Sequence, residues 1–256
     1  FKLFHGWIKH LNREQFETYC FHLGNDFDKA SMHLRNHAQF FFSRLRSNDE
    51  IIQRVRGCEL DVFIYPEIGM DPVTQSLAAL RLVPIQCMAW GHPVTSGLET
   101  IDYFLSSELM ECPDADAHYS ESLVRLPNLS IFYPPPDLSI AKNPDKVSKL
   151  GRRPTRFLCL QSLFKLLPQY DDLFPRIATQ VPNSEFWFIG LDSRGLKELF
   201  RRRLDHAFSR HGLDPNRHVR IFSKMKIGAF LGLVREADII LDSVGWSGGN
   251  TTLEAV

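Results

Sequence analysis

Glycine, hydroxyl and amide residues follow an apolar run near the end of the chain, in a pattern typical of phosphate binding. The stretch 238–242 is typical of a buried strand, residues 243–249 of a bend, and Asn250 with the residues after it of a helix start. The first amides of a helix have no partners inside it and attract anions. The pattern therefore predicts that a phosphate binds at this turn.

Two interpretations fit the side chains of this turn. Gly248 and Gly249 allow the backbone to approach a phosphate closely, and the hydroxyls of Thr251 and Thr252 can donate hydrogen bonds to it. Thr251 and Glu254 also have the spacing of a capping box, which closes a helix start without binding a ligand. These residues alone leave both interpretations open.

A second group of polar residues follows the predicted strand 84–90. Its imidazole, hydroxyls and glycines suit the wall of a ligand site, and its candidate residues are His92, Pro93, Thr95, Ser96 and Gly97. An ordinary turn with an exposed histidine explains the same residues.

A lysine follows the predicted strand 156–160. The ammonium group of Lys165 can neutralise a diphosphate as a point charge, with Gln161 or Ser162 adding hydrogen bonds. A solvated lysine at the start of a helix is the alternative explanation.

Strand and helix patterns alternate in two blocks. Strands are expected at 16–23, 61–65, 84–90, 101–106, 156–160, 185–190, 219–222 and 238–242, and helices at 3–11, 47–56, 71–82, 170–180, 196–211 and 227–236. Alternation of this kind indicates parallel sheets, with ligands at the carboxyl ends of the strands. We expect a first Rossmann-like domain at 1–140, a proline-rich and charged linker at 141–155, and a second domain at 156–256.

Composition limits the class of protein. The hydrophobic fraction is 44%, and the 30 basic residues balance the 30 acidic ones, which argues against a partner such as nucleic acid or an anionic membrane. The basic run 201–203 is interpreted as the solvent-exposed face of a helix. No run of about 18 apolar residues and no signal peptide is present, so a cytoplasmic location is expected.

Five scattered cysteines without a CxxC pair favour reduced thiols over disulfides or a zinc site. Asp114 and Asp116 have the spacing of a metal-binding acidic pair, but they follow Pro113, as acidic residues do at a helix start. We therefore expect no metal. Both ends of the chain lie inside helical patterns, which indicates a fragment of a longer protein.

Four motifs in order resemble the catalytic region of the protein O-linked N-acetylglucosamine transferase and SPINDLY-like family. They occupy residues 84–103, with GHPVTSG, 119–127, 161–165, with QSLFK, and 241–254, with GGNTTLE. The resemblance covers nearly the whole chain. It implies a glycosyltransferase B fold, an α/β architecture in which two Rossmann-like domains with parallel sheets face a cleft. The first domain would receive the acceptor, and the second would hold the nucleotide sugar.

The resemblance also implies roles for residues. Lys165 would contact the diphosphate as a catalytic residue together with His92, and the donor would be bound by Gln161, Ser162, Phe230, Gly248, Gly249, Asn250, Thr251, Thr252 and Glu254. Animal members have glutamine where Ser162 stands, a base-stacking histidine where Phe230 stands, and tyrosine where His92 stands. Phe230 equally suits the core face of a helix. In related sequences, a histidine proposed to matter for catalysis and helical TPR repeats lie before the position of Phe1, and neither is part of this sequence.

The implied activity is inverting, cofactor-free transfer of N-acetylglucosamine from UDP-GlcNAc to Ser or Thr of acceptor polypeptides. Three alternatives stay open: protein O-fucosylation from GDP-fucose, Asn glucosylation from UDP-glucose, and a non-catalytic nucleotide-binding or interaction module.

Overall fold

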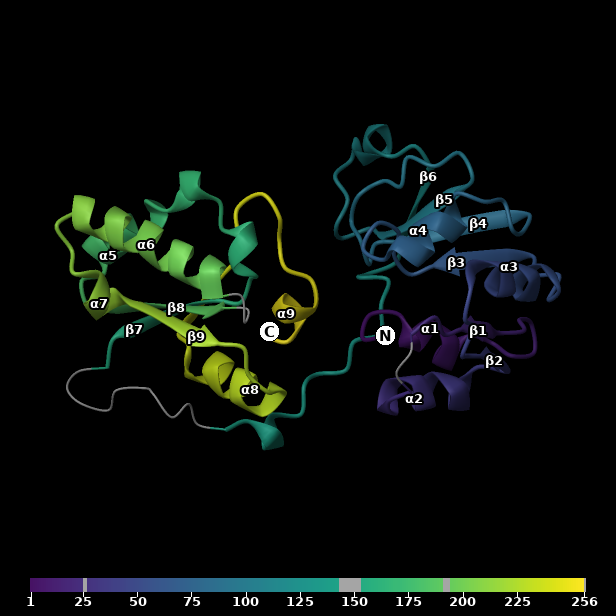
Figure 1. Cartoon of the computed structure of the whole chain (residues 1–256), viewed down its shortest axis with the longest axis horizontal. Coiled ribbons are helices and arrows are strands. Elements are labelled where there is room, and N and C mark those ends of the chain that lie inside the picture. The colour runs from purple at the N-terminus through teal and green to yellow at the C-terminus, as the bar shows by residue number, and fades with distance from the viewer. Residues whose placement is uncertain (25–26, 143–152, 191–193, 256) are drawn as a thin grey trace. The chain divides into compact units, whose positions relative to one another are not determined.

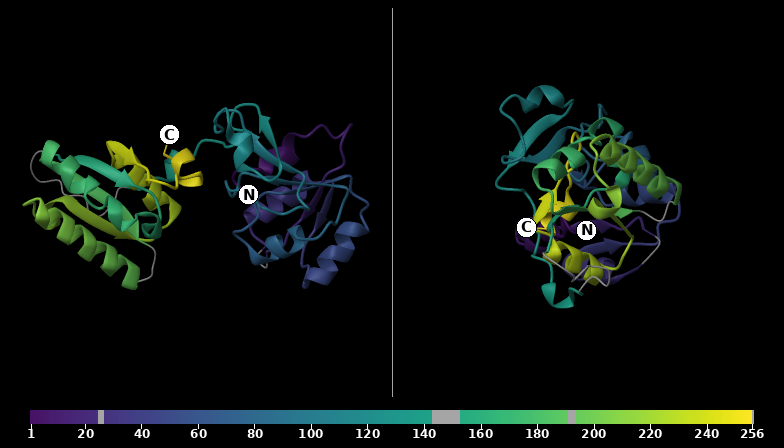
Figure 2. Two further views of the ribbon diagram at one scale, coloured as in Figure 1. Left: turned by 90° about the horizontal axis from the view of Figure 1, so that it is seen from above. Right: turned by 90° about the vertical axis from the view of Figure 1, so that its left-hand side faces the viewer.

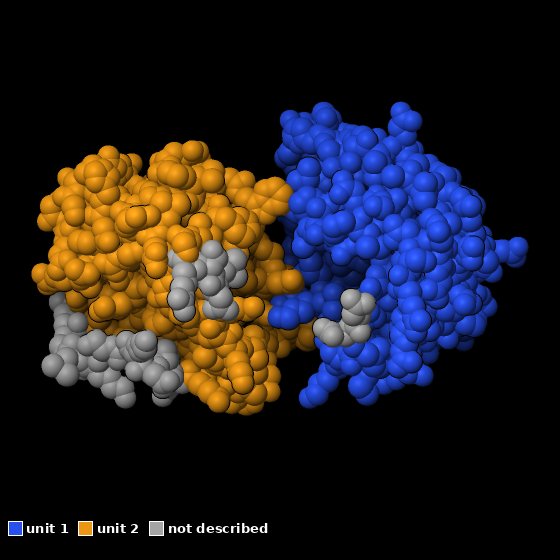
Figure 3. All heavy atoms as spheres, viewed as in Figure 1, with its two compact units in different colours: residues 1–133 blue, residues 134–256 orange. Residues whose placement is uncertain are grey.

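Parallel strands connected by helices and long loops organise both halves of the computed structural model (Figure 1). The structure describes residues 1–24, 27–142, 153–190 and 194–255. The chain forms two compact units, unit 1 with residues 1–133 and unit 2 with residues 134–256 (Figure 3). The predicted first domain ended at residue 140, and residues 143–152 of the expected linker lie outside the described residues.

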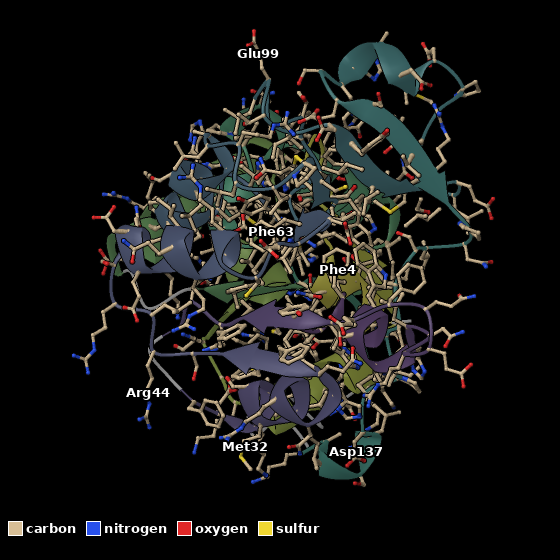
Figure 4. The ribbon with its side chains drawn as sticks, turned by 90° about the vertical axis from the view of Figure 1, so that its right-hand side faces the viewer. Phe4, Met32, Arg44, Phe63, Glu99 and Asp137 are labelled. Atoms are coloured by element: carbon tan, nitrogen blue, oxygen red, sulfur yellow. The ribbon has the colours of Figure 1, made fainter. Side chains whose placement is uncertain are left out.

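Unit 1 is built on a parallel sheet with the strand order β3-β4-β5-β6. Its strands are β3 (Val62–Tyr65), β4 (Ile85–Ala89), β5 (Tyr103–Ser107) and β6 (Ser122–Leu126), beside a smaller parallel pair of β1 (Tyr19–Phe21) and β2 (Phe40–Phe42). The helices are α1 (His5–His10), α2 (Lys29–His37), α3 (Asn48–Arg56) and α4 (Pro72–Ala78). Phe4 and Phe63 pack in the interior, whereas Arg44 and Glu99 project outward (Figure 4).

Several elements of unit 1 differ from the expectation. The sequence did not predict α2, β2 or β6 as elements, and α4 ends before residue 82. Gln86 explains the early end of α4, because its buried side chain accepts a hydrogen bond from the amide of Leu82 at 3.0 Å and donates to the carbonyl of Leu80 at 3.0 Å. The side chain of Gln86, in the next strand, thus forms hydrogen bonds with the amide and carbonyl groups that would bond within a longer helix.

Unit 2 has a parallel sheet with the strand order β10-β7-β8-β9. The strands are β7 (Thr155–Cys159), β8 (Ser184–Gly190), β9 (Val219–Ser223) and β10 (Ile239–Leu241). The helices are α5 (Leu173–Gln180), α6 (Arg194–Arg210), α7 (Pro215–His218), α8 (Ile227–Glu236) and α9 (Asn250–Leu253). No helix in the described ranges is both long and apolar enough to cross a membrane.

Helices cover both faces of this sheet because its side chains alternate in direction (Figures 1 and 2). Phe157 and Phe186 belong to the apolar cluster that includes residues of α5 and α6, whereas Leu158 and Trp187 belong to the cluster that includes residues of α8. Arg156 also anchors α8, since its buried guanidinium pairs with Glu236 at 2.7 Å.

The basic run on α6 is not one solvent-exposed face, so that prediction was wrong at Arg203. The guanidinium of Arg203 donates to both carboxylate oxygens of Asp171, at 2.6 and 2.9 Å, and to the carbonyl of Leu166 at 2.7 Å. Its charged head lies 5.4 Å from the ring centre of Phe200. Arg202 is the exposed member of the run.

Residues 140–142, called the strap below, cross α8 over two glycines. The amide of Lys142 donates to the carbonyl of Gly228 at 2.8 Å. A Cβ on Gly232 would lie 1.6 Å from the carbonyl oxygen of Lys142, and one on Gly228 would lie 2.5 Å from that of Ile140. The strap therefore requires glycine at both positions of α8.

Replacing Gly232→Ala should displace the strap and lower the free energy of unfolding by about 1–3 kcal/mol, because backbone must move to admit the methyl group. Gly195→Ala is the matched control, since nothing lies within 4 Å of its Cβ position. On α6 that change should stabilise by about 0.5–1 kcal/mol. Urea denaturation measures both, and equal effects of the two variants would contradict the close contact.

Candidate functional site

The strand order of unit 2 reverses between β7 and β10. β7 pairs with β8 on one side and with β10 on the other, and the register aligns Leu241 of β10 with Cys159 of β7. The carboxyl ends of the two strands are therefore level. Ligands of open parallel α/β sheets bind at such a reversal, outside the strand ends. The loops after β7 and β10 form the candidate site.

A contact chain connects these two loops. The ammonium of Lys165 donates to Oε1 of Gln161 at 3.1 Å, and Nε2 of Gln161 donates to the hydroxyl of Thr251 at 3.4 Å. Gln161 is buried, while Lys165 and Thr251 are half-buried. Lys165 ends the short 3₁₀ helix η3 (Leu163–Lys165), in which its amide donates to the carbonyl of Ser162 at 2.9 Å. Gln161 thus joins the predicted cation to the first turn of α9.

Asp242 closes the turn that precedes α9. Its carboxylate accepts from the amide of Ser243 at 2.8 Å and from the amide of Gly248 at 3.0 Å. The hydroxyl of Ser243 donates to the carbonyl of Trp246 at 2.6 Å. Asp242 was not among the predicted site residues, although an aspartate directly before a glycine-containing bend is a recognised turn signal.

Gly248 is required by a side chain of the protein itself. A Cβ there would lie 2.1 Å from Nε2 of Gln161 and 2.5 Å from the hydroxyl oxygen of Thr252. Gly249 has open space at the same position. The structure therefore assigns Gly248 to the packing of Gln161 against the turn.

The capping-box interpretation of this segment is wrong. Gly249 is the N-cap of α9 and makes no side-chain cap bond, Thr251 lies inside the helix, and Glu254 follows its last residue. Asn250 and Thr252 are exposed at this helix start. Because α9 has only four residues, its dipole is small, and Lys165 is the main positive charge of the contact chain.

Phe230 is half-buried on α8 and packs against the cluster that contains Leu158, Leu160 and Trp187. The pKa of the Cys159 thiol is raised to about 11, mainly by burial and also by the Asp242 carboxylate, while a backbone hydrogen bond at Gln161 and the Lys165 ammonium oppose the rise. Both charges therefore act on the carboxyl end of β7.

In unit 1, Glu121 clamps the loop that contains Thr95 and Ser96. Its buried carboxylate accepts from the hydroxyl of Thr95 at 2.7 Å, from the amide of Ser96 at 2.8 Å, and from the hydroxyl of Ser96. The hydroxyl of Ser120 lies 3.2 Å away as a further donor. Both predicted wall hydroxyls thus direct their protons to Glu121. Sequence reasoning missed this residue, because contacts across about 25 positions leave no local signal.

His92 lies at the carboxyl ends of β3 and β4. The amide of Gly91 donates to the carbonyl of Pro66 at 3.1 Å, and the His92 ring would lie 3.3 Å from a Cβ on Gly69, whose φ is +108°. His92 is half-buried, and Pro93 and Gly97 are exposed. The imidazole is therefore placed where a parallel sheet presents its ligand-binding edge.

One member of the acidic pair in unit 1 is paired with an arginine. Asp116 pairs with Arg125, and Asp114 precedes the 3₁₀ helix η1 (Ala115–His118). Across the described ranges, no three His, Cys, Asp or Glu side chains gather in a metal-binding arrangement.

Two parallel α/β units of this kind have the glycosyltransferase B class of fold. Residues 3–133 match the model of glycosyl transferase family 41, and the chain belongs to this family. A solved variant of the O-GlcNAc transferase of Thermobaculum terrenum has the same fold, with a TM-score of 0.78 and 23% identity over 98% of this chain and 47% of that chain.

Two curated relatives illustrate the range of the family. A protein of Arabidopsis thaliana named as probable UDP-N-acetylglucosamine–peptide N-acetylglucosaminyltransferase SEC is 26% identical over 94% of this chain. The UDP-glucose:protein N-β-glucosyltransferase of Actinobacillus pleuropneumoniae is 37% identical over 36% of this chain. The chain spans 25% of the first relative and 14% of the second.

Glu121→Gln should lower the free energy of unfolding by about 1–3 kcal/mol at neutral pH, because an amide nitrogen replaces an acceptor of buried donors. Burial opposes ionisation of Glu121, but hydrogen bonds from Ser96 and Thr95 outweigh it and hold its pKa below the ordinary value. Its stabilisation is therefore complete above the unfolded pKa of about 4.3 and disappears as the pH falls through the lower folded pKa.

Denaturation of the Glu121→Gln variant from pH 3 to 8 tests this dependence, with Glu99→Gln as the control because Glu99 is exposed. A stability difference that does not shrink in acid, or an equal loss in the control, would argue against the clamp.

Proposed function

We propose that the protein transfers N-acetylglucosamine from UDP-GlcNAc to Ser or Thr hydroxyls of polypeptides, with inversion at the sugar carbon and without a metal ion. The observation that carries the proposal is the contact chain Lys165–Gln161–Thr251 at the strand reversal. The relatives named for transfer from a UDP-sugar to protein support the donor and acceptor classes.

The mechanism depends on charge at the leaving group. The acceptor hydroxyl loses its proton to water as its oxygen forms a bond to the sugar carbon on one face. The bond to the diphosphate breaks on the other face, and negative charge grows on the diphosphate. Lys165 would stabilise that charge. Gln161 accepts one N–H of the ammonium, which orients the group and leaves its other two protons for phosphate oxygens.

The remaining predicted donor residues extend this proposal. The backbone of the turn and the hydroxyls of Thr251 and Thr252 would contact the phosphates, Glu254 the ribose, and Phe230 the base. In unit 1, His92 would line the wall near the sugar or the acceptor. Because the protons of Thr95 and Ser96 are directed to Glu121, these two residues would position the loop backbone.

Transfer of glucose to Asn is the second candidate. It is favoured by the 37% identity to the N-β-glucosyltransferase, which exceeds the identity to SEC but covers only 91 residues. A donor sugar that differs by one acetamido group changes few contacts, so the shared fold is compatible with either donor.

Intact-mass analysis distinguishes these functions. The full-length protein is incubated with acceptor polypeptides and, separately, UDP-GlcNAc, UDP-glucose and GDP-fucose, each with and without EDTA. We expect an added N-acetylhexosamine on Ser or Thr that persists in EDTA. Glucose on Asn would establish the second candidate, and binding of UDP without any transfer would indicate a non-catalytic module.

Lys165→Met should lower kcat/KM about 100-fold or more, because it removes the charge that opposes the growing diphosphate charge. Lys29→Met removes the same charge from an exposed position on α2 and should leave kcat/KM within twofold. Steady-state rates with purified, folded variants measure both. Near-normal turnover of the Lys165 variant would refute its role.

A further inference from the structure

β9 presents an open edge on the side of the sheet away from β10. Among the described strands it pairs only with β8, through residues 186–190. Figure 1 shows β9 as the outer strand of this sheet, with α6 and α8 beside it. In a parallel strand, alternate residues direct their N–H and C=O groups to opposite neighbours. Half of the β9 backbone groups therefore face away from β8.

A groove runs along this edge between α6 and α8. It consists of two adjoining hollows of about 630 and 510 Å³, which share Lys197, Arg201 and Ile221. Ala229 and Leu233 of α8 line the opposite side. The groove lies at the far edge from the β7–β10 reversal, so it is separate from the contact chain of Lys165.

Two cations of the groove are available to a ligand. Arg202 is exposed and has no hydrogen-bond or ion-pair partner among the described residues. The ammonium of Lys197 contacts only the hydroxyl of Ser223, at 3.4 Å, within the same described part of the chain. Glu198 is the acidic residue of the lining.

The other two basic residues of the groove are already paired. Arg201 bonds to Asp205 at 2.7 Å and Asn216 at 2.7 Å, and it donates to the carbonyl of Val219 at 3.4 Å. Arg220 pairs with Glu185 at 3.1 Å. These pairs hold Arg201 and Arg220 in place along the groove. Because Arg201 occupies the carbonyl of Val219, the residues of β9 after Val219 are left for pairing with an added strand.

We propose that this groove binds an extended acidic segment of a partner polypeptide, which pairs with β9 as an additional strand. Backbone hydrogen bonds to the open edge would supply affinity, as in other cases of strand addition. Acidic side chains on one face of the added strand would reach Lys197 and Arg202, while small apolar ones on the other face would pack toward Ala229 and Leu233.

Charge and packing select this occupant over two others. A second copy of the chain paired through β9 would bring Lys197 and Arg202 close to their own equivalents, and like charges oppose association. Single-stranded nucleic acid requires exposed rings for base stacking. Phe222 of the groove is half-buried and packs edge-on against Trp187, at 5.5 Å between ring centres.

The probe is a blocked, fluorescent hexapeptide of alternating Glu and Val, added to the full-length protein. Anisotropy should show saturable binding, and hydrogen exchange should slow at those amides of residues 220–223 that face away from β8. The double variant Lys197→Glu, Arg202→Glu should bind at least tenfold more weakly. Arg176→Glu is the control for charge reversal as such, because it reverses one charge at an exposed position on α5.

A second peptide separates strand pairing from simple charge attraction. It keeps the glutamates but has proline in place of each valine, so it cannot form the ladder. It should not bind measurably. The proposal is overturned by equal binding of this peptide, by binding without protection of β9, by equal weakening in Arg176→Glu, or by no saturable binding. Arg202→Gln alone repeats the test if the double variant does not fold.

Discussion

Pairing of β7 with both β8 and β10 is the constraint on which the site depends. The chain leaves β7 toward one side of the sheet and returns to its other side at β10, so two loops distant in sequence emerge together. Burial favours the pairing of β7 with β8, because Leu158 and Phe186 are fully buried. Ile239 and Ile240 of β10 are exposed, so the prediction of a buried strand at 238–242 was wrong. The site is thus a consequence of sheet topology. Within it, Gln161 packs against Gly248 and joins the two loops through its hydrogen bond to Thr251.

One buried polar side chain organises each of the two candidate loops. Gln161 both donates and accepts, so it can join an ammonium to a hydroxyl. Glu121 only accepts, and it gathers two hydroxyl protons and an amide. The neutral amide of Gln161 does not neutralise the charge of Lys165, so that charge can still attract a ligand. The carboxylate of Glu121 accepts the hydroxyl protons of Thr95 and Ser96, so these donors are not free for a ligand. The loop in unit 2 is therefore suited to holding an anion, and the loop in unit 1 to presenting a fixed backbone.

Sequence patterns predicted the described strands of all three sheets except β2 and β6, and they predicted α8 to the residue. These elements have strong local signals, namely apolar runs bounded by polar residues. α2 was missed because its apolar periodicity is weak, although Asp28 at its start is a recognised N-cap signal. Lys165, Gln161 and Thr251 were predicted as candidates individually. Their contacts, and the roles of Asp242 and Glu121, arise from long-range geometry that no local pattern records.

The strap over Gly228 and Gly232 has a mechanical consequence. Three consecutive prolines, residues 134–136, precede it and favour a stiff extended rod. Because the strap is seated on α8, the segment that follows the prolines is fixed to that helix. The Glu236–Arg156 pair in turn joins the end of α8 to β7, the strand that Gln161 follows. Strap, helix and central strand of unit 2 are thereby joined into one block by backbone contact and a single ion pair.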